Sequence, residues 1–272
     1  MRVAVCMSGL TRGSLFCLPF LREHIIKPLN ADVFMHTWDI DVGGGGSADR
    51  FLDASKVWRN PQEKMEFFDK EAKNHNYFFS SCMDVFGDKS WNFANAREEK
   101  NVVPMTYSIY KSNALRKKKE EKENFTYDLV IRTRMDTMYE EGIPSQEIEE
   151  VISSPDKVFV RFNGIGHGNM SSRNKFMLEG SGSSFVADQF SFSSSKVMDI
   201  YSDLYLNLNR YFSKSINPCP EVLLANHLKE AGVAPKWSKM QFMSMIEWTG
   251  DKAVFEKHYD KRERKRIDLV HD

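Results

Sequence analysis

The side chains best suited to chemistry in this chain are Arg132, Arg134 and Asp136, which follow the short apolar run Leu129–Ile131. Such a run is typical of a strand that is buried on both faces of a mainly parallel sheet. Charged side chains at the carboxyl end of a buried strand are costly unless they face a ligand, a metal or one another, and in open α/β sheets ligands bind at that end. The segment Tyr127–Asp136 therefore predicts a polar site at a strand tip. An Arg–Asp ion pair that only closes the strand is the alternative.

A second polar segment follows the expected first strand, Arg2–Met7, and contains Ser8, Gly9 and Arg12. An apolar pattern with helical spacing then runs from Leu15 to Ile26. Strand, small-residue turn and helix form the first unit of a nucleotide-binding α/β fold, in which glycines let backbone amides approach a phosphate. Neither a Walker loop nor the dinucleotide pattern GxGxxG is present, so an ordinary tight turn explains the segment equally well.

A third segment, Ala31–Trp38, is expected to be a strand that ends in His36, Thr37 and Trp38. In a nucleotide site Trp38 could stack on a base, and His36 or Thr37 could bond to a ribose. Packing of the same side chains at the rim of the core is the alternative. The three strand tips together predict one site at one edge of a sheet.

The remaining elements alternate between helix and strand. We expect a helix over Val103–Lys122, a strand over Val158–Phe162, a helix from Ser195 capped by Ser194, and a helix from Pro220 to Leu228. Two glycine- and serine-rich stretches, Gly43–Gly46 and Ser171–Ser184, are expected to be loops. This alternation predicts an α/β fold.

The composition limits the classes of function. The 272 residues carry 38 basic and 38 acidic side chains, so no overall charge favours nucleic acid or an anionic membrane. The four cysteines, Cys6, Cys17, Cys82 and Cys219, show no metal-binding spacing and are expected to be reduced thiols of an intracellular protein. The apolar start of the chain is too short for a membrane span. We therefore expect a soluble, cytoplasmic protein.

Taken together, these segments resemble the small microbial and viral glycosyltransferases of the GT-A type, which build capsular or virion glycans. The resemblance extends to about Glu221 and is most specific between Tyr107 and Asp136. It rests on Val3–Gly9 with Arg12, Ala31–Trp38, Tyr107–Asn113, Tyr127–Asp136 and Asp188–Phe190.

The resemblance implies a GT-A-like, Rossmann-like α/β fold with a mixed, mainly parallel sheet flanked by helices, in one domain over residues 1–272. Residues 1–140 would bind the nucleotide sugar, residues 141–250 would face the acceptor, and residues 251–272 would be a charged tail. The implied activity is hexosyl or pentosyl transfer from a nucleotide-sugar donor, expected to be UDP-linked. The acceptor would be an oligosaccharide or a glycoprotein glycan.

The resemblance also suggests roles for single residues. The Asp-x-Asp motif that holds a divalent cation in this family stands here as Arg134-Met135-Asp136, so Asp136 would bind Mn²⁺ or Mg²⁺. An arginine fork also suits diphosphate oxygens, so Arg134 or Arg132 would support the diphosphate or Asp136 itself. The donor-binding residues would be Ser8, Gly9, Arg12, His36, Thr37, Trp38, Asn113, Arg132 and Arg134.

Asp188 has the position and type of the catalytic base, which takes the proton of the acceptor hydroxyl. A capping role or a pairing with an arginine is the alternative. Glu221 is the reserve carboxylate, although an acid at a helix N-terminus is favourable without any function. Further metal-ligand candidates, which packing or surface positions explain equally, are His167, His227 and His258.

Two other functions remain open at this point. A nucleotidyl- or phosphotransferase on a similar sheet would need a lysine or a glycine-rich phosphate loop near the first strand. A non-catalytic glycan-binding module would need neither the charges of the buried strand nor the separate carboxylate of Asp188.

Overall fold

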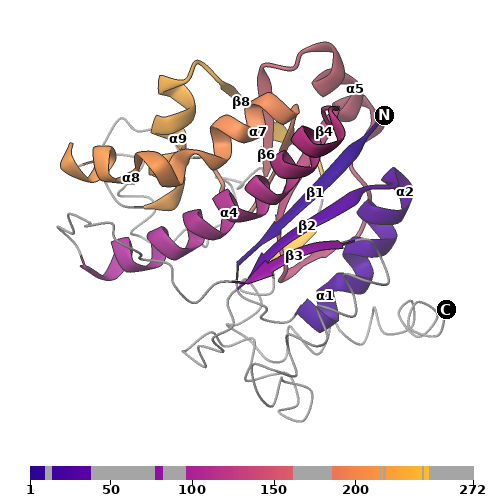
Figure 1. Cartoon of the computed structure of the whole chain (residues 1–272), viewed down its shortest axis with the longest axis horizontal. Coiled ribbons are helices and arrows are strands. Elements are labelled where there is room, and N and C mark those ends of the chain that lie inside the picture. The colour runs from indigo at the N-terminus through magenta and orange to yellow at the C-terminus, as the bar shows by residue number, and fades with distance from the viewer. Residues whose placement is uncertain are drawn as a thin grey trace, which may run out of the picture.

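A computed structural model of the chain describes residues 1–9, 14–37, 77–81, 96–161, 186–214, 216, 219–240 and 242–244. Within these residues, the main sheet has seven strands in the order β3-β2-β1-β4-β7-β6-β8 (Figure 1). The strands are β1 (Val3–Ser8), β2 (Asp32–Thr37), β3 (Tyr77–Ser81), β4 (Leu129–Arg134), β6 (Lys157–Arg161), β7 (Phe190–Ser193) and β8 (Ala234–Ser238).

The sheet is mixed and mainly parallel, which confirms that part of the expected fold class. β1 pairs in parallel with β2 and β4, β2 with β3, and β6 with β8. β7 alone runs against its neighbours β4 and β6. The amino end of β7 therefore lies at the edge of the sheet where the other six strands have their carboxyl ends.

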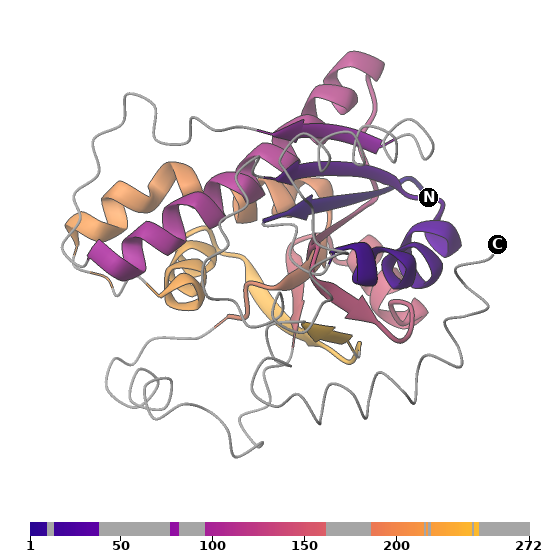
Figure 2. The ribbon, with the colours of Figure 1, turned by 90° about the horizontal axis from the view of Figure 1, so that it is seen from below.

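Helices cover both faces of the sheet (Figures 1 and 2). One face packs against α4 (Ala96–Glu123), α7 (Ser195–Ser202), α8 (Leu204–Ser213) and α9 (Pro220–Glu230). The other packs against α1 (Ser14–Leu21), the π-helical turn η1 (Arg22–Ile26), α2 (Lys27–Leu29) and α5 (Ser145–Ser153). Successive side chains of a strand point to opposite faces, so Ala4 and Cys6 enter the first core while Val3, Val5 and Met7 enter the second.

Local sequence explains several boundaries. Ser194 caps α7 as predicted, because its Oγ accepts a hydrogen bond from the Val197 amide at 3.4 Å. Pro220 occupies the first turn of α9, where the missing amide costs nothing. Gly232 follows α9 with a φ of 73°, a conformation that favours glycine. A separate two-stranded sheet joins β5 (Thr137–Tyr139) to β9 (Phe242–Ser244).

Some predicted boundaries differ from the structure. The predicted helix Val103–Lys122 begins earlier, at Ala96. The strand that was expected to end at Ile131 continues through Arg134, because β1 and β7 pair with this part of β4 on both sides. Gly43–Gly46, Ser171–Ser184 and the tail 251–272 lie outside the described residues. No helix in the described ranges combines the length and the apolar character that a membrane crossing requires.

Candidate functional site

The carboxyl ends of the central strands bring three of the predicted segments together. Ser8 at the end of β1 lies opposite His36 of β2 on one side and opposite Arg134 of β4 on the other. Asp188 stands two positions before the first residue of β7, Phe190, and so reaches the same edge. The strand topology therefore brings three of the predicted donor residues, Ser8, His36 and Arg134, to the same edge of the sheet as the predicted base Asp188.

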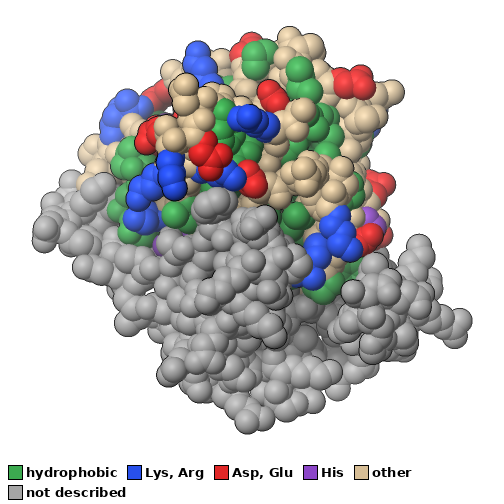
Figure 3. All heavy atoms as spheres, turned by 45° about the vertical axis from the view of Figure 1, so that its right-hand side comes forward, with side chains coloured by type: hydrophobic (Ala, Val, Ile, Leu, Met, Phe, Trp, Pro, Cys, Tyr) green, Lys and Arg blue, Asp and Glu red, His purple; other side chains and the backbone are tan. Residues whose placement is uncertain are grey.

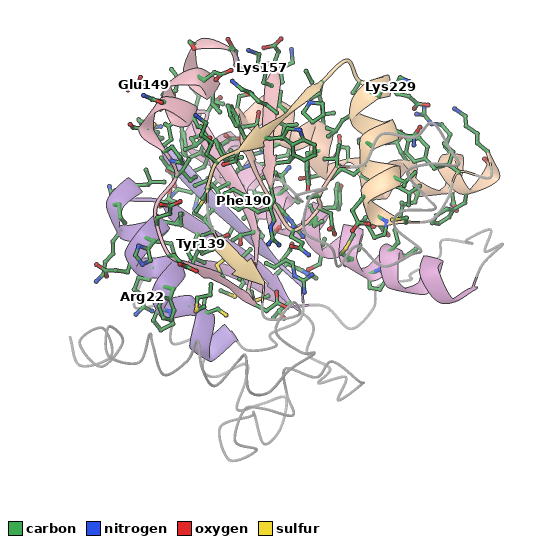
Figure 4. All side chains as sticks on the ribbon, turned by 180° about the vertical axis from the view of Figure 1, so that it is seen from behind. Arg22, Tyr139, Glu149, Lys157, Phe190 and Lys229 are labelled. Atoms are coloured by element: carbon green, nitrogen blue, oxygen red, sulfur yellow. The ribbon has the colours of Figure 1, made fainter. Side chains whose placement is uncertain are left out.

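The segment that carries Asp188 is held from two sides. The Asp188 carbonyl accepts hydrogen bonds from the Arg132 guanidinium and, at 3.3 Å, from the Tyr201 hydroxyl. Directly after it, Phe190 packs edge-on against Tyr139, with ring centroids 5.8 Å apart; Figure 4 labels both side chains. The backbone of Asp188 is thus fixed, while none of the described residues forms an ion pair with its carboxylate.

Arg132 is a buried cation that forms no ion pair with a described carboxylate. Its side chain is 2% exposed, and its Nη1 donates to the Asp188 carbonyl. Among the described residues, its Nε has no hydrogen-bond partner and no carboxylate forms an ion pair with its guanidinium. A buried charge without a counter-ion costs several kcal/mol, roughly, even after relaxation of its surroundings, so this guanidinium is the strongest indication of an anion site.

Arg134 and Asp136 form the ion pair that was the alternative reading of this strand. Arg134 Nε donates to Asp136 Oδ1 at 2.8 Å and Nη2 donates to Oδ2 at 2.6 Å. Asp136 is 2% exposed, whereas the Arg134 side chain is 22% exposed. The ion pair thus holds Asp136 in a fixed orientation at the strand end and leaves part of Arg134 open to solvent.

The same geometry tests how a divalent cation would fit. Among the described residues, no group of three or more His, Cys, Asp or Glu side chains comes together as a metal cage. Asp136 therefore offers a single carboxylate, whose two oxygens each retain lone pairs beside Arg134. A cation that takes most of its ligands from water and substrate phosphates, as Mg²⁺ does, fits such a site.

Gly9 and Thr37 hold the tips of β1 and β2 together. The Gly9 amide donates to Ser108 Oγ of α4 at 2.9 Å, and the Gly9 carbonyl accepts from Thr37 Oγ1 at 2.9 Å. Gly9 has a φ of 114°, which favours glycine strongly. Both backbone groups of Gly9 are therefore used within the protein, and in this structure its amide is not offered to a phosphate.

Glu221, predicted as the reserve carboxylate, lies beside Asp188. The Val186 amide donates to the Glu221 carbonyl at 3.2 Å, which ties the start of α9 to the segment before β7. Burial raises the pKa of Glu221, and the negative charge of Asp188 raises it further. The thiol of Cys219 donates to Glu221 Oε2 at 2.8 Å. Asp188 thus has a second carboxyl group beside it, and the two groups interact electrostatically.

Asn113 lies in a different cluster, between α4 and α7. Its Nδ2 donates to Asp199 Oδ1 at 2.9 Å, and its Oδ1 accepts from Arg116 Nε at 2.9 Å. Arg116 is fully buried and also pairs with Glu120 at 2.6 Å. These contacts account for the polar atoms of Asn113, so the structure does not bring this predicted donor residue to the strand tips.

The remaining predicted residues divide into two groups. Both ring nitrogens of His227 are engaged, with the Tyr211 hydroxyl at 2.9 Å and the Ile200 carbonyl at 2.7 Å, and burial lowers its pKa. These contacts assign it to packing between helices. The others lie outside the described residues: Arg12, Trp38, His167 and His258.

Sequence reasoning missed Ser108 and Tyr201 as residues of the site. The tyrosines Tyr107 and Tyr110 are the most conspicuous apolar side chains of the α4 segment, and they are only partly buried. Its fully buried positions include Ser108 and Ser112 instead. The sequence did offer one signal for this buried polar face. Ser108 and Ser112 stand four residues apart, and positions i and i+4 lie on the same face of a helix.

Comparison with known proteins adds no assignment. No model of a known protein family matches the chain, and no curated protein sequence matches it.

Proposed function

We propose that this protein is a glycosyltransferase that moves a sugar from a nucleotide-sugar donor, expected to be UDP-linked, to a glycan acceptor. The observation that carries the proposal is Arg132, a buried guanidinium without a described counter-ion at the carboxyl edge of the central strands. The mixed, mainly parallel sheet agrees with the GT-A-like fold that the sequence resemblance implies. Ligands of open α/β sheets bind at this edge.

A diphosphate is the anion that this position suits. Arginine presents a planar fork of donors that matches phosphate oxygens, and such charge-assisted hydrogen bonds are about twice as strong as neutral ones. Among the described residues, two further buried polar atoms also lack hydrogen-bond partners, Ser8 Oγ at this edge and Thr137 Oγ1 at the start of β5. A bound diphosphate would supply acceptors to these groups and a counter-charge to Arg132.

The proposed reaction needs a base, and Asp188 is the candidate. The bond between the anomeric carbon of the sugar and the phosphate oxygen breaks, and the electron pair leaves with the nucleoside diphosphate. The acceptor oxygen forms the new bond to the anomeric carbon, while Asp188 takes the hydroxyl proton. Its carboxylate is free of ion pairs with the described residues, and its backbone is fixed by Arg132 and Tyr201.

Asp136 would hold a Mg²⁺ or Mn²⁺ ion together with the diphosphate oxygens, with Arg134 fixing its carboxylate. When bound, the cation would neutralise charge that develops on the leaving diphosphate. Arg132 would contribute positive charge to the same group, so neutralisation is divided between the protein and the ion.

The described part of one face carries side chains of both charges. On the face shown in Figure 3, basic and acidic side chains of the described residues are interspersed and form no single-sign stripe. The equal numbers of basic and acidic residues, 38 each, agree with this. A nucleic-acid-binding protein would be expected to concentrate positive charge on one face.

The test is calorimetric titration of the protein with a panel of nucleoside diphosphates and nucleotide sugars, with and without Mn²⁺. We expect at least one of them to bind, and we expect the Arg132→Met variant to bind it much more weakly. Incubation with the bound donor and a mixture of glycan acceptors should release free nucleoside diphosphate. Release of pyrophosphate would instead identify a nucleotidyltransferase, and failure of every nucleotide to bind would overturn the proposal.

A further inference from the structure

Ser108 of α4 connects two strand tips through one buried hydroxyl group. Its Oγ accepts a hydrogen bond from the Gly9 amide at 2.9 Å. The same oxygen lies 2.8 Å from Nδ1 of His36 and 3.1 Å from the backbone carbonyl oxygen of His36. Both side chains are completely buried. The orientation of the His36 ring is therefore set from α4, a helix far away in sequence.

Counting hydrogens assigns the tautomer of His36. A serine hydroxyl has one hydrogen to donate and can accept two hydrogen bonds. If Ser108 donates to the His36 carbonyl, then Nδ1 must carry a hydrogen that it donates to Ser108, and all three contacts become hydrogen bonds. If Ser108 donated to Nδ1 instead, its contact with the carbonyl would be lost. The first arrangement makes one more hydrogen bond, so it is favoured by about 1 kcal/mol.

The surroundings keep this imidazole neutral. Burial and, as the smaller cause, the positive charge of Lys111 together lower the pKa of His36 from 6.5 to about 4. The ring of Tyr107 stands edge-on to His36, with centroids 5.6 Å apart, and Lys111 Nζ lies 5.7 Å from the centre of the Tyr107 ring. A neutral ring with hydrogen on Nδ1 carries a lone pair on Nε2.

We propose that Ser108 is a positioning residue that holds His36 as the neutral Nδ1–H tautomer, so that Nε2 accepts a hydrogen bond from a ribose hydroxyl of the donor. The inference rests on the proposed function and specifies the chemistry of one part of that site. A lone pair on Nε2 suits a hydroxyl and disfavours a phosphate oxygen, which cannot donate. Thr37 is the other residue predicted to meet the ribose, and its hydroxyl already donates to the Gly9 carbonyl at 2.9 Å.

The first experiment concerns the ligand-free protein. Long-range ¹H–¹⁵N NMR correlations of the imidazole should show the Nδ1–H tautomer of His36 at neutral pH in wild type and in Ser108→Thr, which keeps the hydroxyl. In Ser108→Ala, the Nε2–H form should become populated. Ser112→Ala is the matched control, because Ser112 is also buried on α4 but its hydroxyl donates to Ile109 O at 3.0 Å. A wild-type Nε2–H tautomer, or an unchanged one in Ser108→Ala, would contradict the assignment.

The second experiment measures affinity for UDP and for its 2′-deoxy and 3′-deoxy analogues, none of which carries a transferred sugar. Loss of one hydrogen bond of about 1 kcal/mol corresponds to roughly 5-fold weaker binding. We expect at least one analogue to bind wild type about that much more weakly than UDP, with the difference reduced in Ser108→Ala and retained in Ser112→Ala. Equal binding of all three ligands to wild type would overturn the ribose contact and leave the proposed function standing. No binding of any nucleotide would overturn both.

Discussion

The contrast between two buried arginines gives the sharpest test of the proposed site. Arg116 is 0% exposed and Arg132 is 2% exposed. Both are among the largest fully buried side chains of the described residues. Arg116 pairs with Glu120 and Asp199, whereas no described carboxylate pairs with Arg132, whose Nη1 donates to the Asp188 carbonyl. Replacement of each by methionine, which keeps most of the volume, should therefore have opposite consequences for stability and ligand binding.

For Arg132→Met, the lost hydrogen bond from a charged group costs about 1.5–3 kcal/mol. This loss is offset by relief of a buried charge that costs several kcal/mol, roughly. We expect the free energy of unfolding of the ligand-free variant to lie within about 1 kcal/mol of wild type, or above it. Binding of a nucleoside diphosphate should weaken roughly 10- to 100-fold, because one or more hydrogen bonds to a charged group are lost.

For Arg116→Met, two acids lose their buried partner, and the expected destabilisation is about 3–5 kcal/mol. Denaturant unfolding followed by circular dichroism gives both free energies, and calorimetric titration gives the affinities. At a temperature where Arg116→Met is folded, it should bind as wild type does. If Arg132→Met bound UDP with unchanged affinity, or if it lost as much stability as Arg116→Met, Arg132 would be a structural cation and our reasoning would fail.

The remaining predictions concern the other residues of the edge. Asp188→Asn should lower the rate of sugar transfer about 10²- to 10⁴-fold with unchanged donor affinity, because an amide cannot take the proton of the acceptor hydroxyl. Equal losses of rate and affinity in Asp188→Asn would argue against a base. Asp136→Asn should abolish the stimulation of donor binding by Mn²⁺ in titrations with and without the ion, and stimulation that persists would remove Asp136 from the metal site. Gly9→Ala should lower the free energy of unfolding, measured with denaturant, by about 1–3 kcal/mol, because a φ of 114° is strained for alanine. The added Cβ itself would meet no atom within 4 Å. An unchanged free energy of unfolding would show that the turn relaxes. The folded-state pKa of His36 is lowered from 6.5 to about 4, so its contribution to stability is complete above pH 6.5 and is lost as the pH falls toward 4. His36→Asn should therefore flatten the dependence of the unfolding free energy on pH between those values. Parallel stability curves of wild type and variant would refute this.

Local sequence patterns were sufficient to predict the strands and helix starts that position the site. The apolar runs at Val3–Met7 and Leu129–Ile131 became central strands, and Ser194 and Pro220 marked helix starts. These features depend on neighbouring residues, so a sequence displays them directly. The convergence of strand tips followed from the same reasoning, since carboxyl ends of parallel strands meet at one edge.

The contacts within the site depend on pairings that no local pattern displays. β4 continues through Arg134 because β1 and β7 pair with it on both sides. Glu221 reaches Asp188 through a backbone hydrogen bond to Val186. The buried face of α4 carries polar residues such as Ser108 beside Val103 and Ile109, so the usual rule that helices turn apolar residues inward does not find them. The partners of Asn113 were equally hidden in the sequence, because Arg116 and Asp199 come from two different helices.

The reversed direction of β7 has a consequence for the energetics of the proposed reaction. Because Asp188 enters the edge ahead of this strand, its backbone is held by the guanidinium that faces the proposed leaving group. Any shift of Arg132 toward a bound diphosphate would also displace the Asp188 carbonyl to which it donates. Donor binding would then change the position of the proposed base. In a double-mutant cycle such neighbours typically show an interaction energy of about 0.5–3 kcal/mol. The cost of replacing Asp188 should then depend on which residue stands at position 132.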